Sequence, residues 1–195
     1  MGRIKSALEI ALERTESVKS DKDSIGQFEA KQQGKKIANE FLEDPSRSLE
    51  ESLKKAPKEQ RESLKQGIFE VLLSQIALPL TRDDEKRIQA VGRGLGAVIS
   101  DGHFPGRYKQ FTQIIARYLD DADQYDKAIR RQYEPKLRAK EEELSRRYGR
   151  QVQLDPFQDP EFVTFYNQNM SALKQNYQGA VDQIREEAGR CFDGS

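Results

Sequence analysis

The chain is poor in the residues that build disulfides, metal centres and membrane spans. Its one cysteine, Cys191, cannot form an internal disulfide and gives no sign of an oxidising compartment. Its one histidine, His103, excludes metal centres that need several histidines, such as the Glu-x-x-His pairs of di-iron bundles. The longest apolar stretch, residues 71–80, is interrupted by Ser74 and Gln75 and is too short for a membrane span. We therefore expect a cytoplasmic protein with no metal, no cofactor and no membrane insertion.

Neither sign of charge predominates, and apolar residues are scarce. Lys and Arg number 33, as do Asp and Glu, so no overall field attracts nucleic acid or anionic lipid. Hydrophobic residues make up 35% of the chain and charged residues 34%, which is lean for the core of a compact globule. That balance is typical of long helices that each bury one apolar stripe and expose their other faces to water.

Two such stripes are present in the second half of the chain, and they argue against disorder. Their apolar residues recur in steps of three or four, which places each set on one face of a helix. The first stripe contains Tyr108, Phe111, Ile115, Tyr118, Ala122, Tyr125 and Ile129. The second contains Phe162, Tyr166, Met170, Leu173, Tyr177, Ala180, Ile184 and Cys191. The pattern predicts an all-α protein that ends in a long antiparallel hairpin resembling a coiled coil, elongated in shape.

The charges of the two hairpin arms are complementary. Residues 107–150 carry 12 Lys/Arg and eight Asp/Glu, whereas residues 151–195 carry three and seven. An antiparallel pair sets the basic arm against the acidic one, although burial of the stripes is the larger contribution to stability. Pro135 falls inside the first arm, so we expect a kink or a break near residue 135.

The first half of the chain also has helical periodicity. One long helix is predicted for residues 1–45, whose early stripe contains Ile4, Leu8, Ala11, Thr15, Val18 and Ile25. The stripe then fades, and Gly26 and Gly34 each weaken a helix interior by roughly 1 kcal/mol. We therefore expect the middle third of this helix to be frayed, bent or exposed.

Residues 46–106 are predicted to form a helical core, between this helix and the hairpin of residues 107–195. Ser46 or Ser48 can cap a short helix, and two further helices over 58–78 and 82–100 form a hairpin, the second opened by a capping box at Thr81 and Asp84. The Gly/Pro-rich residues 101–106 predict a turn.

Three groups of residues resemble chemical motifs, and each has a simpler interpretation. The carboxylates of Asp120, Asp121, Asp123 and Asp126 miss the Asp-Asp-x-x-Asp spacing of prenyl-transferring enzymes, because residue 124 is Gln, so a solvated face is favoured. The glycines of residues 92–96 have no preceding strand, so they favour close approach of a neighbouring helix over nucleotide binding. Cys191 has no histidine nearby in the sequence, and the Asp101–His103 pair lies in a surface turn.

The basic arm of residues 127–150 is the remaining candidate. Its arginines and lysines could bind phosphates, with interleaved tyrosines to stack on bases, although Glu134 and residues 141–143 interrupt the row. The candidate interaction surface contains Arg130, Arg131, Arg138, Arg146 and Arg147.

The function predicted from the sequence is that of a non-enzymatic scaffold or interaction protein that acts through amphipathic helix faces. A protein partner or self-association is expected, and no small-molecule substrate is evident. The alternative is a nucleic-acid-binding or ribosome-associated helical factor that uses the arm of residues 127–150. No catalytic, cofactor-binding or metal-binding residue is predicted.

Overall fold

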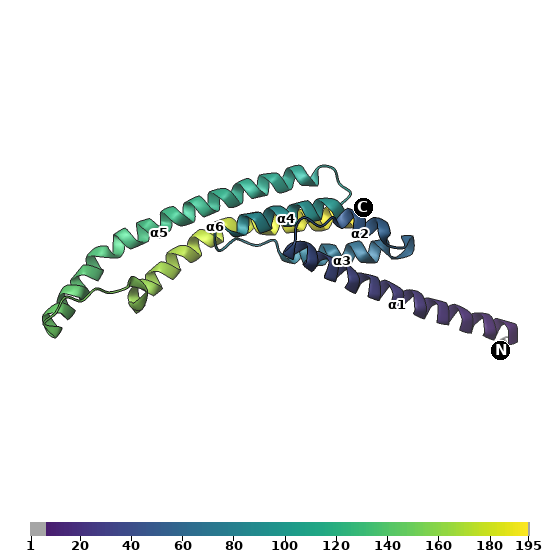
Figure 1. The fold of residues 1–195 in the computed structure, drawn as a ribbon, viewed down its shortest axis with the longest axis horizontal. Helices are drawn as coiled ribbons and strands as arrows, with labels where there is room; N and C mark the ends of the chain where they lie inside the picture. The colour runs from purple at the N-terminus through teal and green to yellow at the C-terminus, as the bar shows by residue number, and fades with distance from the viewer. Residues whose placement is uncertain (1–6, 195) are drawn as a thin grey trace, which may run out of the picture. The chain divides into compact units, whose positions relative to one another are not determined.

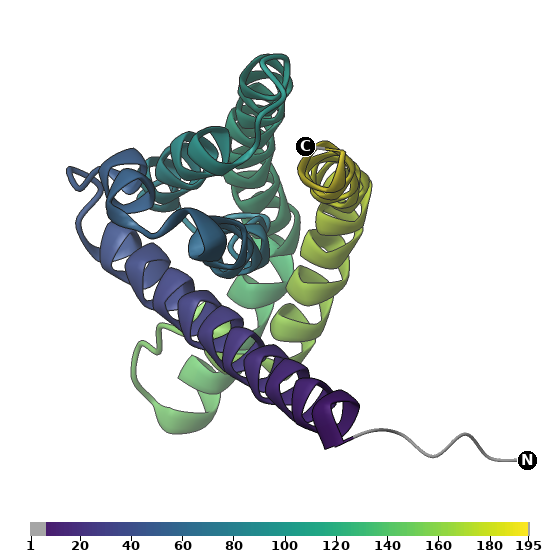
Figure 2. The ribbon, with the colours of Figure 1, turned by 90° about the vertical axis from the view of Figure 1, so that its right-hand side faces the viewer.

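The protein is all-α, as predicted. The computed structural model describes the backbone of residues 7–194 and the side chains of residues 24–194. Within these residues it contains helices and no strand (Figure 1 and, turned by 90°, Figure 2). The α-helices are α1 (Ala7–Glu43), α2 (Leu49–Lys55), α3 (Arg61–Ser74), α4 (Asp84–Val98), α5 (Phe104–Tyr148) and α6 (Pro160–Asp193). The 3-10 helices are η1 (Lys58–Gln60) and η2 (Pro156–Gln158).

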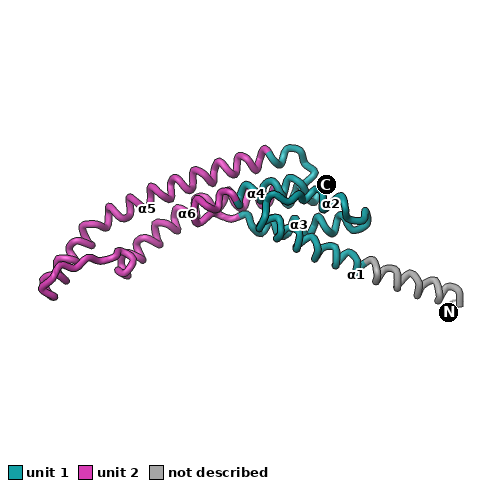
Figure 3. Tube along the Cα trace, viewed as in Figure 1, with its two compact units in different colours: residues 1–76, 87–105, 188–195 teal, residues 77–86, 106–187 magenta. Residues whose placement is uncertain are grey.

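The chain divides into two compact units (Figure 3). Unit 1 consists of residues 1–76, 87–105 and 188–195, and unit 2 consists of residues 77–86 and 106–187. Unit 1 therefore contains α1 to α3 and most of α4, and unit 2 contains most of α5 and α6. The division into residues 1–45, 46–106 and 107–195 stays a prediction.

Local signals in the sequence determine several helix ends. The side chain of Ser48 accepts a hydrogen bond of 3.2 Å from the backbone N–H of Glu51 and so caps α2. Asp84 accepts one of 3.1 Å from the N–H of Thr81, which is one half of the predicted capping box. Gly149 has a φ of 65°, the left-handed conformation that commonly ends a helix, and it directly follows α5.

Other helix ends differ from the prediction. The helix predicted for residues 58–78 starts with η1 and ends at Ser74, where Gln75 and Ile76 instead donate to carbonyls three residues back. The helix α5 starts at Phe104, inside the predicted turn, because Pro105 suits a first turn, whose N–H groups need no partner within the helix. The helix continues through Pro135 to Tyr148 without a break, and the kink expected near residue 135 stays a prediction.

In unit 1, α1 and α3 meet at two glycines. A Cβ atom at Gly34 would lie 2.2 Å from the carbonyl oxygen of Leu64, and one at Gly67 would lie 2.1 Å from that of Lys31. Ala30 and Ala38 are buried on the same helix as Gly34. The exposed middle third that the sequence predicted is confirmed at residues 24, 25 and 27–29, but it does not extend to Gly34, because small residues replace large ones where two backbones touch. The side chains of the stripe residues before residue 24 lie outside the part of the chain that the structure describes.

One glycine of α4, Gly94, serves a similar purpose. A Cβ atom at Gly94 would lie 2.7 Å from Cδ1 of Leu72 and 2.9 Å from Cε1 of Phe41. Neighbouring side chains therefore occupy the space that a side chain at residue 94 would need, as expected if a small residue lets a neighbouring helix approach closely.

In unit 2, α5 and α6 pack against each other in antiparallel order. The ring of Tyr118 contacts that of Tyr177 with centroids 5.3 Å apart, and the ring of Tyr133 contacts that of Phe162 at 5.2 Å. Residues later in α5 thus contact residues earlier in α6, as antiparallel packing requires. Most residues of the first stripe are buried, but Tyr125 is 43% exposed. A helix of 3.6 residues per turn rotates slightly relative to a strict seven-residue repeat. The buried face of α5 therefore bypasses Tyr125 and continues at Ile129 and Tyr133.

Candidate functional site: a groove between α5 and α6

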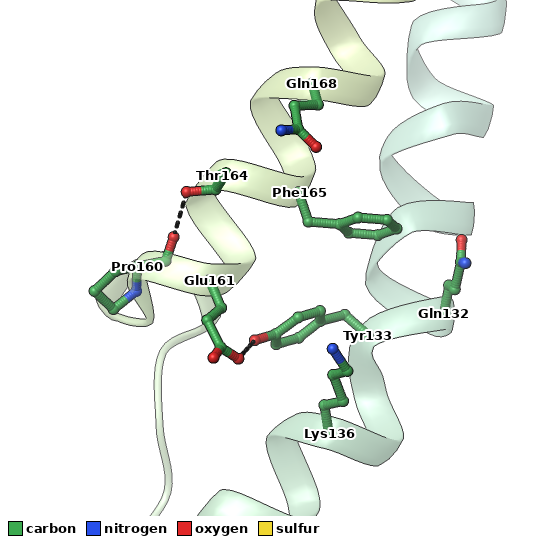
Figure 4. A pocket seen from close by; sticks show the side chains of 8 residues that line it. All are labelled: Gln132, Tyr133, Lys136, Pro160, Glu161, Thr164, Phe165 and Gln168. Atoms are coloured by element: carbon green, nitrogen blue, oxygen red, sulfur yellow. Dashed lines mark hydrogen bonds between the residues drawn. The ribbon is translucent and has the colours of Figure 1, made fainter.

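Unit 2 contains a cavity of about 510 Å³ between the second half of α5 and the start of α6, which we call the α5–α6 groove (Figure 4). Side chains from both helices line it. These are Gln132, Tyr133 and Lys136 of α5, and Pro160, Glu161, Thr164, Phe165 and Gln168 of α6.

Aromatic rings form the apolar wall of the groove. Tyr133 is 5% exposed, and its ring lies 6.2 Å from that of Phe165. Behind them Phe162 is fully buried and packs with Ile129. This packing holds the rings of Tyr133 and Phe165 in place, so the apolar wall is present before any ligand arrives.

Next to the groove, one lysine joins two carboxylates and a phenol. The Nζ of Lys140 lies 2.8 Å from Oδ2 of Asp159 and 2.9 Å from Oε2 of Glu161. The hydroxyl of Tyr133 donates to Oδ2 of Asp159 at 2.9 Å and lies 3.3 Å from Oε2 of Glu161. Asp159 is the only buried charged side chain among the residues whose exposure is described, and it also accepts from the N–H of Glu161 at the start of α6.

The ionisation of this cluster follows from its contacts. The hydrogen bond from Lys140 lowers the pKa of Asp159, and the two carboxylates raise the pKa of Lys140. Burial, followed by the neighbouring carboxylate of Asp159, raises the pKa of Tyr133. At neutral pH the cluster therefore holds an ammonium, two carboxylates and a neutral phenol. It joins α5 to the first turn of α6.

The rim of the groove carries polar side chains that form no hydrogen bond or ion pair with any described residue. Lys136 lies with its Nζ 5.8 Å from the centroid of the Tyr133 ring, and it makes no ion pair with a described residue. The amides of Gln132 and Gln168 are exposed, on opposite helices, and have no hydrogen-bond partner in that part of the chain. The groove thus offers an aromatic wall, one available cation and two amides.

The predicted interaction surface is partly neutralised within α5 itself. Arg130 pairs with Asp126 at 2.9 Å, and its guanidinium lies 5.1 Å from the ring centroid of Phe157. The remaining arginines fall into two classes. Arg138 pairs with Glu134 and Arg146 with Glu142, whereas Arg131 and Arg147 are exposed and make no ion pair among the described residues.

The aspartates of α5 have partners, although Asp120 and Asp123 stay exposed, as expected of a solvated face. Arg82 donates to Asp120 and to Asp123, each at 2.7 Å, and thereby attaches residues 77–86 to α5. Asp121 accepts from the hydroxyl of Tyr177. No cluster of three or more side chains within the described residues could hold a metal ion.

The turn of residues 101–103 and Cys191 meet in unit 1. The thiol of Cys191 donates to Oδ2 of Asp101 at 3.2 Å, and the backbone N–H of His103 donates to Oδ1 of the same carboxylate at 2.8 Å. Asp101 thus stabilises its own turn and contacts the end of α6. None of the helices, as far as they are described, is long and apolar enough to cross a bilayer.

The groove was not predicted, although the sequence contained part of its signal. Continuing the first stripe by four residues from Ile129 reaches Tyr133, and the second stripe begins at Phe162. In the sequence, Asp159 followed by Pro160 indicates only a helix start with its cap. Its second role depends on Lys140 from another helix.

A comparison with family models gives one match, over residues 50–189, to a model described as "Family of unknown function (DUF6657)". The match includes the α5–α6 groove. No curated protein and no solved structure matches the chain.

Proposed function

The chain belongs to the DUF6657 family, and we propose that it is a non-enzymatic scaffold of the cytoplasm that self-associates through an exposed face of α1. The observation that carries this proposal is a pair of large apolar side chains in water. Ile25 is 58% exposed and Phe28 is 63% exposed, one turn apart on the helix. An apolar pair on a helix surface favours contact with another protein surface.

The two faces of α1 support this role. Ile25 precedes Gly34 by nine residues, which is two and a half turns, so it lies on the opposite side of the helix from the contact with α3. Burial against α3 therefore leaves Ile25 available. The stripe expected from Ile4 to Ile25 would extend the same face towards the N-terminus.

The groove also fits a binding role better than a catalytic one. The ionisable groups of the adjoining cluster, Lys140, Asp159 and Glu161, neutralise one another, and the pKa of Lys140 is raised, away from the range useful for acid–base work at neutral pH. These contacts support a structural role for the cluster.

Light scattering coupled to size exclusion tests the proposal. We expect the wild type to exceed the monomer mass of 22.4 kDa, increasingly so at higher concentration. The variant Ile25→Glu/Phe28→Glu should be monomeric with unchanged helicity, and the exposed-site control Gln33→Glu should behave like the wild type. A wild type that stays at 22.4 kDa throughout the concentration series contradicts the proposal.

A second candidate function is nucleic-acid binding by the arm of residues 127–150, favoured by exposed arginines that make no ion pair among the described residues, Arg131 and Arg147 among them. In that case single-stranded RNA should bind at low salt and dissociate as salt rises, as measured by fluorescence anisotropy. Arg131→Glu/Arg147→Glu should weaken binding, and Lys174→Glu on α6 should not. Absence of binding at low salt eliminates this function.

A further inference from the structure

We propose that the α5–α6 groove receives Phe28 and Glu29 from α1 of a second copy of this chain. The inference rests on the proposed self-association and names the surface that α1 contacts. It joins two features that are otherwise unexplained, an exposed phenylalanine on α1 and an open aromatic groove in unit 2.

The apolar part of the groove fits a phenylalanine ring. The half-buried Phe165 presents aromatic surface at its wall, beside the buried ring of Tyr133, and a third ring can pack against it edge to face or offset. The cavity of about 510 Å³ lies within the range of roughly 300–1,000 Å³ of ligand sites. It therefore has room for the ring of Phe28 together with part of its helical turn.

The charges at the rim match the residue that follows Phe28. Lys136 brings an ammonium group that has no ion-pair partner among the described residues. Glu29 is an exposed carboxylate that likewise makes no ion pair with any of them. With the ring of Phe28 in the groove, the next side chain of α1 lies within reach of the rim, where Glu29 pairs with Lys136. The amides of Gln132 and Gln168 accommodate further polar atoms of the incoming turn.

This contact is head-to-tail, since it joins α1 of one copy to α5 and α6 of another. Such a heterologous interface leaves one free groove and one free α1 at the ends of every open assembly. The assembly therefore grows with concentration unless it closes into a ring. A symmetric contact between two α1 helices would stop at a dimer.

Mixing two variants tests the inference. Phe28→Glu removes the aromatic anchor and leaves the groove intact, whereas Lys136→Glu/Gln168→Glu alters the groove and leaves Phe28 intact. Each variant alone should have a mass of 22.4 kDa by light scattering, and an equimolar mixture should form a complex of twice that mass. The control Lys127→Glu/Gln175→Glu adds the same charges at exposed positions outside the groove and should associate like the wild type.

A charge exchange provides the second arm. Glu29→Lys alone should weaken self-association, and combining it with Lys136→Glu in one chain should restore it. Thermal melting by circular dichroism checks that every variant is folded.

The outcomes separate this inference from the proposed function. If Phe28→Glu is monomeric but the groove variant associates like the wild type, the groove is not the partner surface, and self-association through α1 stands. The same conclusion follows if the mixture forms no complex. If the wild type is itself monomeric, the proposed function fails and this inference fails with it.

Discussion

The hydroxyl of Tyr133 donates a hydrogen bond of 2.9 Å to Oδ2 of Asp159, a residue 26 positions later in the chain. The same carboxylate also accepts hydrogen bonds from the ammonium of Lys140 and from the backbone N–H of Glu161 in the first turn of α6. One buried side chain thus caps one helix and attaches it to another. Because the rings of Tyr133 and Phe165 form the wall of the α5–α6 groove, this contact also determines the shape of the groove.

Removing the members of this contact should destabilise the protein to different degrees. Tyr133→Phe loses one hydrogen bond and should lower the free energy of unfolding by about 0.5–1.5 kcal/mol. Asp159→Ala loses that bond and the helix cap together, so we expect a loss of about 2–3 kcal/mol. Urea denaturation followed by circular dichroism measures both changes.

Tyr125→Phe is the matched control, since Tyr125 is 43% exposed on the same helix. Its effect should stay within about 0.5 kcal/mol. Equal effects of Tyr133→Phe and Tyr125→Phe would show that the hydrogen bond to Asp159 contributes nothing to stability.

Asp159 should also make stability depend on pH in the acid range. Its pKa in the folded protein is lowered from the ordinary value of 3.8, chiefly by Lys140. Its contribution is therefore fully present above pH values near 3.8 and is lost as the pH falls through the lower, folded-state pKa. Urea titrations of the wild type and Asp159→Asn at several pH values should show the two converging as the solution is acidified. A difference that is constant with pH would contradict this assignment.

The glycine contact between α1 and α3 should tolerate no side chain. Gly34→Ala or Gly67→Ala places a Cβ atom 2.1–2.2 Å from a backbone oxygen, which neither helix can avoid without moving. We expect each substitution to lower the free energy of unfolding by about 1–3 kcal/mol or more. Gly179→Ala in α6 meets no atom within 4 Å and should instead stabilise by about 0.5–1 kcal/mol. Thermal or urea denaturation distinguishes these signs, and a neutral Gly34→Ala variant would refute the close contact.

Arg82 should hold residues 77–86 on α5 through a contact that salt weakens. Its two carboxylate partners on α5, Asp120 and Asp123, are exposed, so ions screen the attraction. Arg82→Ala should leave the melting temperature almost unchanged but speed limited proteolysis near Leu80, which is 84% exposed. High salt should speed cleavage of the wild type in the same way, whereas Lys86→Ala should not. Unchanged cleavage of Arg82→Ala would show that the ion pairs do not restrain this segment.

The sequence by itself determined the helical class and many helix ends of this protein. The reason is that these features depend on neighbours within a few residues along the chain. Three helix ends are local in this sense: the cap of α2 at Ser48, the start of α6 at Asp159–Pro160, and the end of α5, where Gly149 has a positive φ. The two apolar stripes likewise predicted that α5 and α6 would each bury one face.

Only the tertiary structure decided which residues from distant segments meet. Gly34 appeared to be a weak point in a helix, and it became a contact once Leu64 was placed against it. The sequence predicted the exposure of the aspartates of α5, but not that Arg82 from another segment pairs with Asp120 and Asp123. The α5–α6 groove and the burial of Asp159 likewise depend on two helices being brought together. Such pairings are set by the packing of whole helix faces, whose register and approach are not encoded in the spacing of either helix alone.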